Sequence, residues 1–352
     1  MEIKLIKSKN SKISNVDYDN LGFCKYYTDH MFICDYIDGS WQNFRIQPFQ
    51  DLSLSPACTT LHYGQTIFEG LKAYRNQEGE ILIFRPNKNA ERFNKSAERM
   101  CMPKIPEDIF IKSIEELLSV DKAWVPEGEK NSLYIRPISF ALDPYIGIKP
   151  ADNYKFMIIC GMAGGYYSEP VNVKIETHYT RAVSGGVGFS KTAANYAAAL
   201  YPAVEAQKDG YHQLIWTDGK SHEFVEESGT MNLFFVINNQ LVTPPLGDTV
   251  LDGVTRDSII HLSKLLNIDV DVRKVSVKEV ISSLENGSMS EAFGAGTAAT
   301  IAPIKSIGYN NKKYNLPEIS KKSISNTLLN KLSNIKFGRE LTELNWLKKI
   351  SK

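Results

Sequence analysis

The 352-residue sequence lacks the long apolar run that a membrane-spanning helix needs. No stretch reaches the roughly 18 consecutive apolar residues that would indicate a transmembrane helix. Residues 1–10 alternate lysine with aliphatic residues and contain no signal-peptide core. The formal net charge is only +1, which gives no strong field for nucleic acid or acidic lipid. We therefore expect no membrane and no nucleic-acid partner.

Paired cysteines are also missing. The five cysteines are odd in number and all lie in the first half of the chain, and their spacings contain neither a CxxC pair nor a zinc pattern. Mostly buried, reduced thiols are the simplest interpretation, and they indicate a cytoplasmic location. The cysteines are Cys24, Cys34, Cys58, Cys101 and Cys160.

Several catalytic signatures are absent as well. The six histidines never occur as HExxH or HxH, so we predict no metal site. No GxSxG nucleophile elbow occurs, and neither GxGxxG nor the complete P-loop pattern GxxxxGK[S/T] is present. Zinc hydrolysis, serine hydrolysis, hydride transfer and nucleotide hydrolysis therefore lose their usual sequence support.

What is present indicates a globular α/β chain of two domains. The apolar fraction is 43% and the charged fraction 23%, and the length suits two domains of ordinary size. Residues 161–170 concentrate glycine and end in proline, as a domain connection does. We predict a smaller amino-terminal α/β domain over residues 1–167, a linker over 168–181 and a larger carboxyl-terminal domain over 182–352.

Local patterns place strands and helices in both halves. The Asp38-Gly39 pair predicts a hairpin within residues 25–48, and Asn87 or Asn89 can cap a following helix. In that helix Ala90, Phe93, Ala97 and Met100 share an apolar face, while Arg92, Ser96 and Arg99 fall elsewhere. Further helices are predicted over residues 107–121, 254–265 and 277–284, and strands over 132–138, 155–160, 213–216, 231–237 and 240–243.

One lysine stands in an unusual neighbourhood. Lys191 follows three glycines within four residues, Gly185, Gly186 and Gly188, which give the chain little preference for helix or strand. Alanines after it favour helix, and Tyr196 follows five positions later. Such crowding by small residues suggests that something bulky approaches the backbone near Lys191. A surface lysine that opens an alanine-rich helix is the alternative.

An acidic segment and two possible anion-binding segments could belong to the same site as Lys191. Glu227 precedes a glycine, a threonine and a buried strand. The loop 251–256 enters a helix, whose free N–H groups and positive dipole suit a phosphate, and the small-residue segment 292–300 could supply further N–H groups.

A lysine nucleophile, a buried acid and an anion cradle fit together if the cofactor is pyridoxal 5′-phosphate. The lysine would bind the cofactor aldehyde and move the substrate proton, while the acid keeps the pyridine nitrogen protonated.

These segments, in this order, resemble the branched-chain-amino-acid aminotransferases, members of fold type IV of the pyridoxal-phosphate enzymes. The resemblance runs from about Tyr27 to the region of residue 338. It rests on His62-Tyr63-Gly64-Gln65, Phe68-Glu69-Gly70-Leu71-Lys72-Ala73, Phe84-Arg85-Pro86 with Arg92, Tyr134-Ile135-Arg136-Pro137, Gly185 to Tyr196, Glu227-Ser228-Gly229-Thr230-Met231-Asn232, Thr243-Pro244-Pro245-Leu246, Gly253-Val254-Thr255-Arg256 and Gly294-Ala295-Gly296-Thr297-Ala298.

The resemblance implies a role for each matching residue. Lys191 would hold the cofactor and act as the acid and base, and Glu227 would contact the pyridine nitrogen. Tyr196 would contact the phenolic oxygen of the cofactor, and Thr230 would lie beside its ring. The phosphate would be bound by Arg92, Val254, Thr255 and Thr297, and the cofactor set is completed by Leu251, Gly253 and Gly296.

The family's substrate pocket accepts two unlike side chains. Aliphatic side chains would pack on aromatic residues, and the distal carboxylate of glutamate would meet Arg136, with Tyr63 nearby. Ordinary core packing is the alternative for each tyrosine. The predicted substrate residues are Tyr27, Tyr63, Phe68, Tyr134, Arg136, Tyr166, Thr230, Thr297 and Ala298, and Tyr196 is a further aromatic candidate.

The sequence departs from the family pattern in two places. Many relatives have glycines after the lysine, where this chain has Ala193-Ala194. Mammalian members carry a CxxC after the Gly-Thr-Ala turn, whereas here residues 299–302 read Ala-Thr-Ile-Ala, so we expect no thiol regulation of that kind.

The expected protein is thus a homodimeric, two-domain α/β (α+β) enzyme of fold type IV. It would transfer amino groups between leucine, isoleucine or valine and 2-oxoglutarate by a ping-pong route. A D-amino-acid aminotransferase or aminodeoxychorismate lyase of the same fold type is the nearest alternative. A non-catalytic binding protein on the same scaffold would lack Lys191, Glu227 or Arg92, and all three are present.

Overall fold

The computed structural model describes residues 1–167, 169–340 and 343–350, which form two compact units. The amino-terminal unit comprises Met1–Tyr166, Ser190–Ala194 and Asn334–Lys352, and the carboxyl-terminal unit comprises Tyr167–Phe189 and Asn195–Ser333. The predicted linker begins at residue 168, which lies outside the described residues. Two short pieces of the predicted carboxyl-terminal domain thus belong to the amino-terminal unit.

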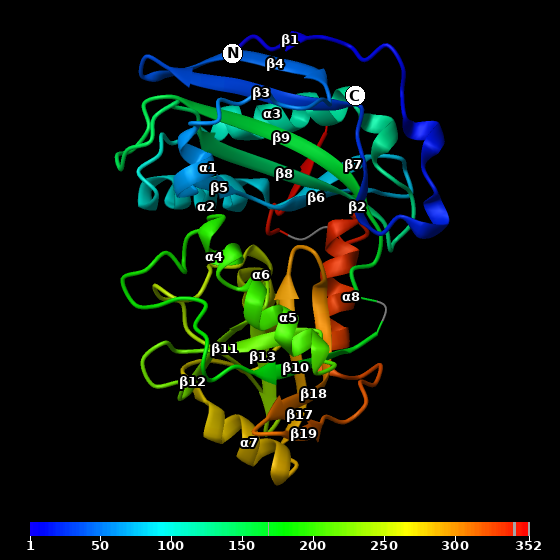
Figure 1. Cartoon of the computed structure of the whole chain (residues 1–352). Coiled ribbons are helices and arrows are strands. Elements are labelled where there is room, and N and C mark those ends of the chain that lie inside the picture. Colours follow the sequence, from blue (N-terminus) through cyan, green and yellow to red (C-terminus); the bar gives the residue numbers. More distant parts are fainter. Residues whose placement is uncertain (168, 341–342, 351–352) are drawn as a thin grey trace. The chain divides into compact units, whose positions relative to one another are not determined.

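The amino-terminal unit is built on one sheet with the strand order β1-β4-β3-β9-β8-β6-β7-β20, in which β2 also pairs with β9 and β5 with β8 (Figure 1). All of its pairings are antiparallel except β1 with β4. The strands are β1 (Lys4–Leu5), β2 (Phe23–Tyr27), β3 (His30–Ile37), β4 (Ser40–Pro48), β5 (Thr66–Phe68), β6 (Leu71–Arg75), β7 (Ile81–Phe84), β8 (Ser132–Ala141), β9 (Tyr154–Ala163) and β20 (Leu347–Lys349).

The predicted hairpin at Asp38-Gly39 is confirmed, because Ile37 pairs with Ser40 where β3 turns into β4. β20 explains why the last residues join this unit, since Leu347 pairs with Phe84 at the edge of the sheet. The unit also contains α1 (Thr59–Tyr63), α2 (Pro86–Arg99), α3 (Glu107–Val120) and the short 3-10 turns Ile13–Asn15, Tyr18–Asn20 and Lys122–Trp124.

Helices α2 and α3 cover one face of this sheet and enclose its core. Phe93 of α2, Phe110 of α3 and Phe156 of β9 meet with ring centroids 5.5–5.9 Å apart, and all three are buried. The predicted apolar positions Ala90, Phe93 and Ala97 are buried as expected.

The predicted cap of α2 is wrong. The helix begins at Pro86, with Arg85 as its N-cap, rather than at Asn87 or Asn89. Proline suits the first helical turn, where its missing N–H leaves no bond unmade. Asn89 therefore does not cap the helix, and its buried side-chain amide donates to Glu69.

The carboxyl-terminal unit is built on a second sheet, in the order β15-β14-β13-β17-β18-β10-β11-β12-β16, with β19 paired to β18. An additional pairing of β12 with β13 closes six of these strands into a ring. The strands are β10 (Val171–Ile175), β11 (Gln213–Thr217), β12 (Phe224–Ser228), β13 (Met231–Ile237), β14 (Gln240–Thr243), β15 (Val270–Val272), β16 (Val275–Ser276), β17 (Met289–Gly296), β18 (Thr300–Tyr309) and β19 (Lys312–Asn315).

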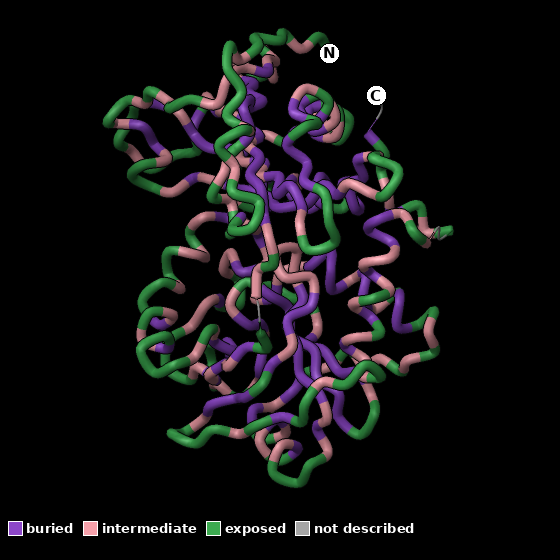
Figure 2. The backbone as a smooth tube through the Cα atoms, turned by 90° about the vertical axis from the view of Figure 1, so that its right-hand side faces the viewer, coloured by how far each residue is buried: buried purple, intermediate pink, exposed green. Residues whose placement is uncertain are grey.

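Most of the core of this unit lies in the strands of the ring. Figure 2 shows buried residues in the interior of the molecule and exposed ones along its outer loops. β13 is buried at every position, as expected of a continuous apolar run such as Met231–Ile237. The helices are α4 (Ala194–Ala197), α5 (Leu200–Lys208), α6 (Val254–Leu265), α7 (Val277–Glu285) and α8 (Ile324–Lys336). The helix predicted over 254–265 is confirmed residue for residue, and α4 begins at the boundary between the two units.

Among the described residues, no helix is both long and apolar enough to cross a membrane. The described residues also contain no group of His, Cys, Asp and Glu side chains that could hold a metal ion. Cys34, Cys58 and Cys160 are buried free thiols, whereas Cys24 is half-buried and Cys101 exposed.

Candidate active site

Lys191 is attached to the amino-terminal unit by its backbone. Its N–H donates to Ser96 Oγ at 2.8 Å, and its carbonyl accepts from the N–H of Phe68 at 3.0 Å. The next residue, Thr192, forms a β-bridge with Ile67 and donates its hydroxyl to the carbonyl of Thr66 at 2.7 Å. The five-residue piece Ser190–Ala194 thus extends the edge beside β5. The side chain of Lys191 is half-buried, with Nζ 5.0 Å from the ring centroid of Phe68.

Arg92 lies on α2, one turn before Ser96, and is 7% exposed. Its Nε donates to Glu69 Oε1 at 2.7 Å and its Nη2 to Glu69 Oε2 at 2.9 Å, in a two-pronged ion pair. Burial alone would raise the pKa of Glu69. The charge and hydrogen bonds of Arg92, together with the charge of Lys191, instead hold that pKa below its ordinary value. The predictions for Lys191 and Arg92 therefore fall on one local cluster.

Two of the predicted substrate residues, Phe68 and Tyr134, flank the guanidinium of a third, Arg136. Arg136 on β8 lies 4.5 Å from the ring centroid of Phe68 and 5.3 Å from that of Tyr134, and its Nη2 donates to the Tyr134 phenol oxygen at 2.9 Å. Gly70 makes this arrangement possible, because a Cβ at that position would overlap the Tyr134 phenol. An apolar wall and a cation are thus side by side.

The other predicted tyrosines are placed differently. Tyr166 is linked to Tyr134 through Phe23, whose ring lies 4.9 Å from Tyr134 and 5.2 Å from Tyr166. Tyr27 stacks on Phe49 at 5.0 Å. Tyr63 ends α1 and is 44% exposed. The structure gathers Phe68, Tyr134, Arg136 and Tyr166 into a connected group, while Tyr27 and Tyr63 extend its surroundings.

Glu227 is the buried acid of the carboxyl-terminal unit. It sits on β12 opposite Asn232 of β13, at the pairing that closes the ring. Arg181 donates from Nη2 to Glu227 Oε2 at 2.8 Å and from Nε at 3.1 Å, and the backbone N–H of Leu251 donates to Oε1. The arginine compensates the charge of the buried carboxylate. Asn232 fixes the loop, since its amide donates to the carbonyl of Leu251 at 2.9 Å.

The loop from Leu251 leads into the amino terminus of α6. Gly253 is the N-cap of this helix, and Val254 and Thr255 are its first two residues, both buried. A Cβ at Gly253 would overlap Asn232 Oδ1, so only glycine fits this close approach. The start of α6 therefore has the N–H groups and the dipole that a phosphate requires.

The segment predicted as a small-residue turn is only partly a turn. Residues up to Gly296 belong to strand β17, and only residues 297–299 form the turn before β18. Thr230, in the turn between β12 and β13, lies beside it, since a Cβ on Gly296 would be 3.3 Å from the Thr230 carbonyl oxygen. Thr230 and Thr297 thus come from two neighbouring turns, Gly296 ends β17 beside them, and Ala298 follows Thr297. Tyr196 lies in α4 and is half-buried.

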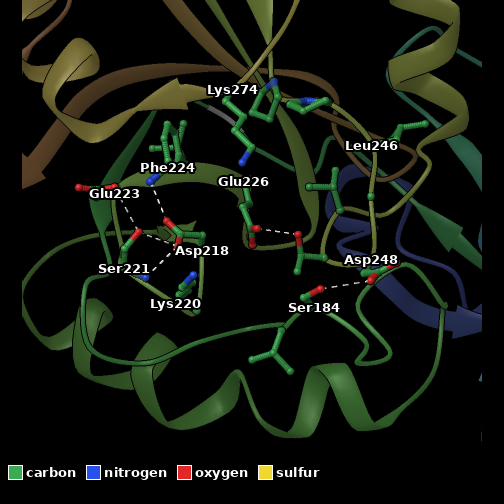
Figure 3. Close-up of a pocket in the computed structure, with 18 residues that line it drawn as sticks. Ser184, Asp218, Lys220, Ser221, Glu223, Phe224, Glu226, Leu246, Asp248 and Lys274 are labelled. Atoms are coloured by element: carbon green, nitrogen blue, oxygen red, sulfur yellow. Dashed lines mark hydrogen bonds between the residues drawn. The ribbon is translucent and has the colours of Figure 1, made fainter.

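A pocket of about 650 Å³ in the carboxyl-terminal unit lies apart from these residues (Figure 3). Glu226 lines it and accepts a hydrogen bond from Thr249 at 2.6 Å. Glu227, the next residue of β12, is not among the residues that line this pocket. Of the described residues that line it, none is a predicted site residue.

Sequence reasoning missed several partners of the predicted residues. Glu69 lies in one of the family motifs, but the motif predicts no role for it. Ser96 is predicted only to lie off the apolar face of its helix. Arg181 and Phe23 gave no signal, because a single arginine or phenylalanine outside any motif is indistinguishable from a surface or core residue.

Comparison with known proteins agrees with this geometry. Residues 66–307 match the family model described as amino-transferase class IV. The chain belongs to the class IV aminotransferase family.

Its relatives narrow the family further. The chain is 39% identical to branched-chain-amino-acid aminotransferase 2 of Bacillus subtilis, over 100% of this chain and 97% of that one. It is 41% identical to branched-chain-amino-acid transaminase 1 of the same organism, over 94% of each. Within class IV the chain is therefore a branched-chain-amino-acid aminotransferase, as its motifs predicted.

Solved structures show the same fold. A branched-chain aminotransferase of Thermoproteus uzoniensis with norvaline matches with a TM-score of 0.75 at 25% identity, covering 92% of this chain and 100% of that one. The enzyme of Thermobaculum terrenum in its PLP form matches with a TM-score of 0.74 at 22% identity, over 91% and 98%. The predicted α/β fold of type IV is confirmed.

The cofactor of this family is pyridoxal 5′-phosphate, and the residues of this chain fit it. The first N–H groups of α6 have no acceptor within the helix and can therefore bind a phosphate. Glu227 is a buried, charge-compensated acid. When bound, the cofactor withdraws electrons from the substrate Cα so that its proton can leave.

Proposed function

We propose that this enzyme transfers the amino group of L-leucine, L-isoleucine or L-valine to 2-oxoglutarate, reversibly and by a ping-pong route. The observation that carries the proposal is the packing of Arg136 against both Phe68 and Tyr134. An aliphatic side chain can lie on the aromatic rings, and the distal carboxylate of glutamate can pair with the guanidinium. One pocket can therefore take two unlike substrates in turn, which transamination of these amino acids demands.

The proposed roles are those that the resemblance implies. Lys191 would bind the cofactor and would carry the proton that leaves and returns to the substrate Cα. Arg92 and the residues at the start of α6 would hold the phosphate, and Glu227 would pair with the pyridine nitrogen. The remaining cofactor contacts are Tyr196, Thr230, Leu251, Gly253, Val254, Thr255, Gly296 and Thr297, and the outer substrate contacts are Tyr27, Tyr63, Tyr166, Thr230, Thr297 and Ala298.

A panel of L-amino acids with 2-oxoglutarate tests the proposal. We expect leucine, isoleucine and valine to be turned over at least about tenfold more efficiently than D-alanine, since each missing apolar contact costs about 1–3 kcal/mol. Arg136→Met should raise KM for 2-oxoglutarate and leave KM for leucine nearly unchanged. Turnover of D-alanine in preference to leucine would favour a D-amino-acid aminotransferase instead.

We propose further that two copies of the chain associate through an apolar surface of the amino-terminal unit. Leu61 and Tyr63 of α1 are exposed there, and so are Tyr145, Ile146 and Ile148 of the loop between β8 and β9, with Ile148 96% exposed. The two segments are tied together, because Thr59 donates to the carbonyl of Asp143 and Cys58 forms a β-bridge with Pro144. Exposed apolar residues gathered in this way mark an interaction surface.

Light scattering after gel filtration tests this association. The wild type should have twice the 39.6 kDa mass of one chain. The double substitution Ile146→Asp, Ile148→Asp should lower the measured mass toward that of a single chain. Substitution of exposed Leu265→Asp on α6 is the matched control and should leave the dimer intact. A dimer that survives the double substitution would contradict this surface.

We also propose that the enzyme works in the cytoplasm, because its five cysteines are free thiols. We propose that the connection between the two domains lies within the predicted range 168–181, before β10 (Val171–Ile175), which belongs to the sheet of the carboxyl-terminal unit.

A further inference from the structure

Glu69 is a carboxylate with no exposed surface, held entirely by donors of the amino-terminal unit. Its Oε1 accepts from Arg92 Nε, and its Oε2 accepts from Arg92 Nη2 at 2.9 Å, from Asn89 Nδ2 at 2.8 Å and from the N–H of Gly70 at 3.0 Å. Its backbone is fixed as well, since its N–H donates to the carbonyl of Pro137 at 2.8 Å. The position of this charge is therefore set from several sides.

The ion pair determines how Arg92 is oriented. A guanidinium is planar, and a fork through Nε and Nη2 fixes both the plane and the rotation of the group. The Nη1 side then points away from Glu69. A lysine in place of Arg92, or a shorter acid in place of Glu69, would keep the charges but lose this fixed direction.

The same carboxylate lies close enough to Lys191 for the lysine's charge to act on it. The chain on either side of Glu69 is also tied to Lys191. Phe68 donates its N–H to the Lys191 carbonyl, and Ser96, which accepts from Lys191 N–H, donates its hydroxyl to the carbonyl of Arg92 at 3.0 Å. Two cations far apart in sequence thus share one buried counter-charge.

We propose that Glu69 is a positioning residue that acts through Arg92, orienting its guanidinium for the cofactor phosphate while compensating the charge of both Arg92 and Lys191. This inference rests on the roles proposed above for Arg92 and Lys191. Glu69 touches neither substrate nor cofactor in this account. Loss of Glu69 should therefore weaken binding of the cofactor phosphate rather than binding of the cofactor ring.

Equilibrium binding of two probes to the apoenzyme tests this role. We expect Glu69→Gln to raise the Kd of pyridoxal 5′-phosphate at least about tenfold, a change of about 1.4 kcal/mol. The Kd of pyridoxal, which lacks the phosphate, should change less than about twofold. Glu91→Gln is the matched control, since Glu91 is on the same helix but pairs with Lys88 on the surface, and neither Kd should change.

A double substitution separates action through Arg92 from independent action. If Glu69 works through Arg92, the Kd of pyridoxal 5′-phosphate should be about the same in Glu69→Gln, Arg92→Met as in Arg92→Met alone. Losses that multiply would overturn the proposal. So would equal weakening of pyridoxal and its phosphate, which would indicate a general structural role.

A milder variant guards against failure to fold. Glu69→Asp retains the charge but is too short to keep both prongs of the fork, so we expect an intermediate loss of phosphate-dependent affinity in a protein that still unfolds cooperatively. An unchanged Kd in this folded variant, together with an unchanged Kd in Glu69→Gln, would refute the proposal. Leucine turnover by the wild type is measured separately, and its absence would overturn the proposed function while leaving the role of Glu69 intact.

Discussion

Lys191→Ala should abolish both covalent attachment of the cofactor and turnover of leucine. General acid–base catalysis by one side chain contributes about 10²–10⁴-fold, and loss of covalent attachment adds to this, so we expect a fall of at least about 10⁴-fold in kcat. The visible absorbance of the bound cofactor should disappear. Both are measured on the purified protein, by its spectrum and by single-turnover kinetics with leucine.

The structure indicates that this loss would be chemical rather than structural. Lys191 is held by its own N–H and carbonyl, through Ser96 and Phe68, and neither bond involves the side chain that the substitution removes. The Tm should therefore stay within a few degrees of that of the wild type. Lys88→Ala, on the exposed side of α2, is the control and should retain full turnover. Wild-type kcat in Lys191→Ala would remove this lysine from the mechanism.

The fold was largely predictable where one local rule dominates. The 254–265 helix has an apolar period and a glycine before it, and β13 is an uninterrupted apolar run, so both were located from the sequence. The start of α2 was misplaced because two asparagines competed with a proline for the same signal. The return of residues 347–349 to pair with β7 depends on contacts between distant segments, which no local pattern encodes.

The structure gives a further reason for the glycines before Lys191. Their small size was attributed to the approach of a bulky group near the lysine. In the structure Gly188 packs against the loop at Asp248, where a Cβ would lie 2.8 Å from the Asp248 carbonyl oxygen. Gly185 adopts a φ of +73°, which favours glycine. Close packing and backbone conformation within the carboxyl-terminal unit thus account for two of the three glycines.

The site residues themselves carried a signal, whereas their partners did not. Lys191, Glu227 and Arg92 stand in distinctive motifs. Lys191 and Arg92 belong to one network in the amino-terminal unit, and Glu227 belongs to a separate one in the carboxyl-terminal unit. Arg181 pairs with Glu227 across 46 positions of sequence. A long-range ion pair has no spacing rule, so only the folded chain shows that the acid has a cationic partner.

Glu227→Gln should lower kcat by about 10²–10³-fold and destabilise the protein as well. Without the negative charge, the pyridine nitrogen would lose the acceptor that keeps it protonated. Loss of one electrostatic partner of a reacting group, measured for an oxyanion-hole donor, costs about 2.7–4 kcal/mol of barrier. The glutamine oxygen could still accept from the Leu251 N–H. Its amide would then face the donors of Arg181, which would be left buried without a carboxylate, at a cost of about 3–5 kcal/mol in the free energy of unfolding.

The two effects can be separated with a second substitution. Arg181→Met removes the guanidinium that Glu227→Gln leaves uncompensated, so the double variant should regain much of the free energy of unfolding, measured by urea denaturation. Its kcat should stay as low as that of Glu227→Gln, because the lost charge at the ring nitrogen is not restored. Recovery of both stability and kcat in the double variant would mean that Glu227 serves only to neutralise Arg181. Recovery of stability alone would mean that Glu227 acts at the ring nitrogen during the reaction, and that Arg181 only compensates its charge.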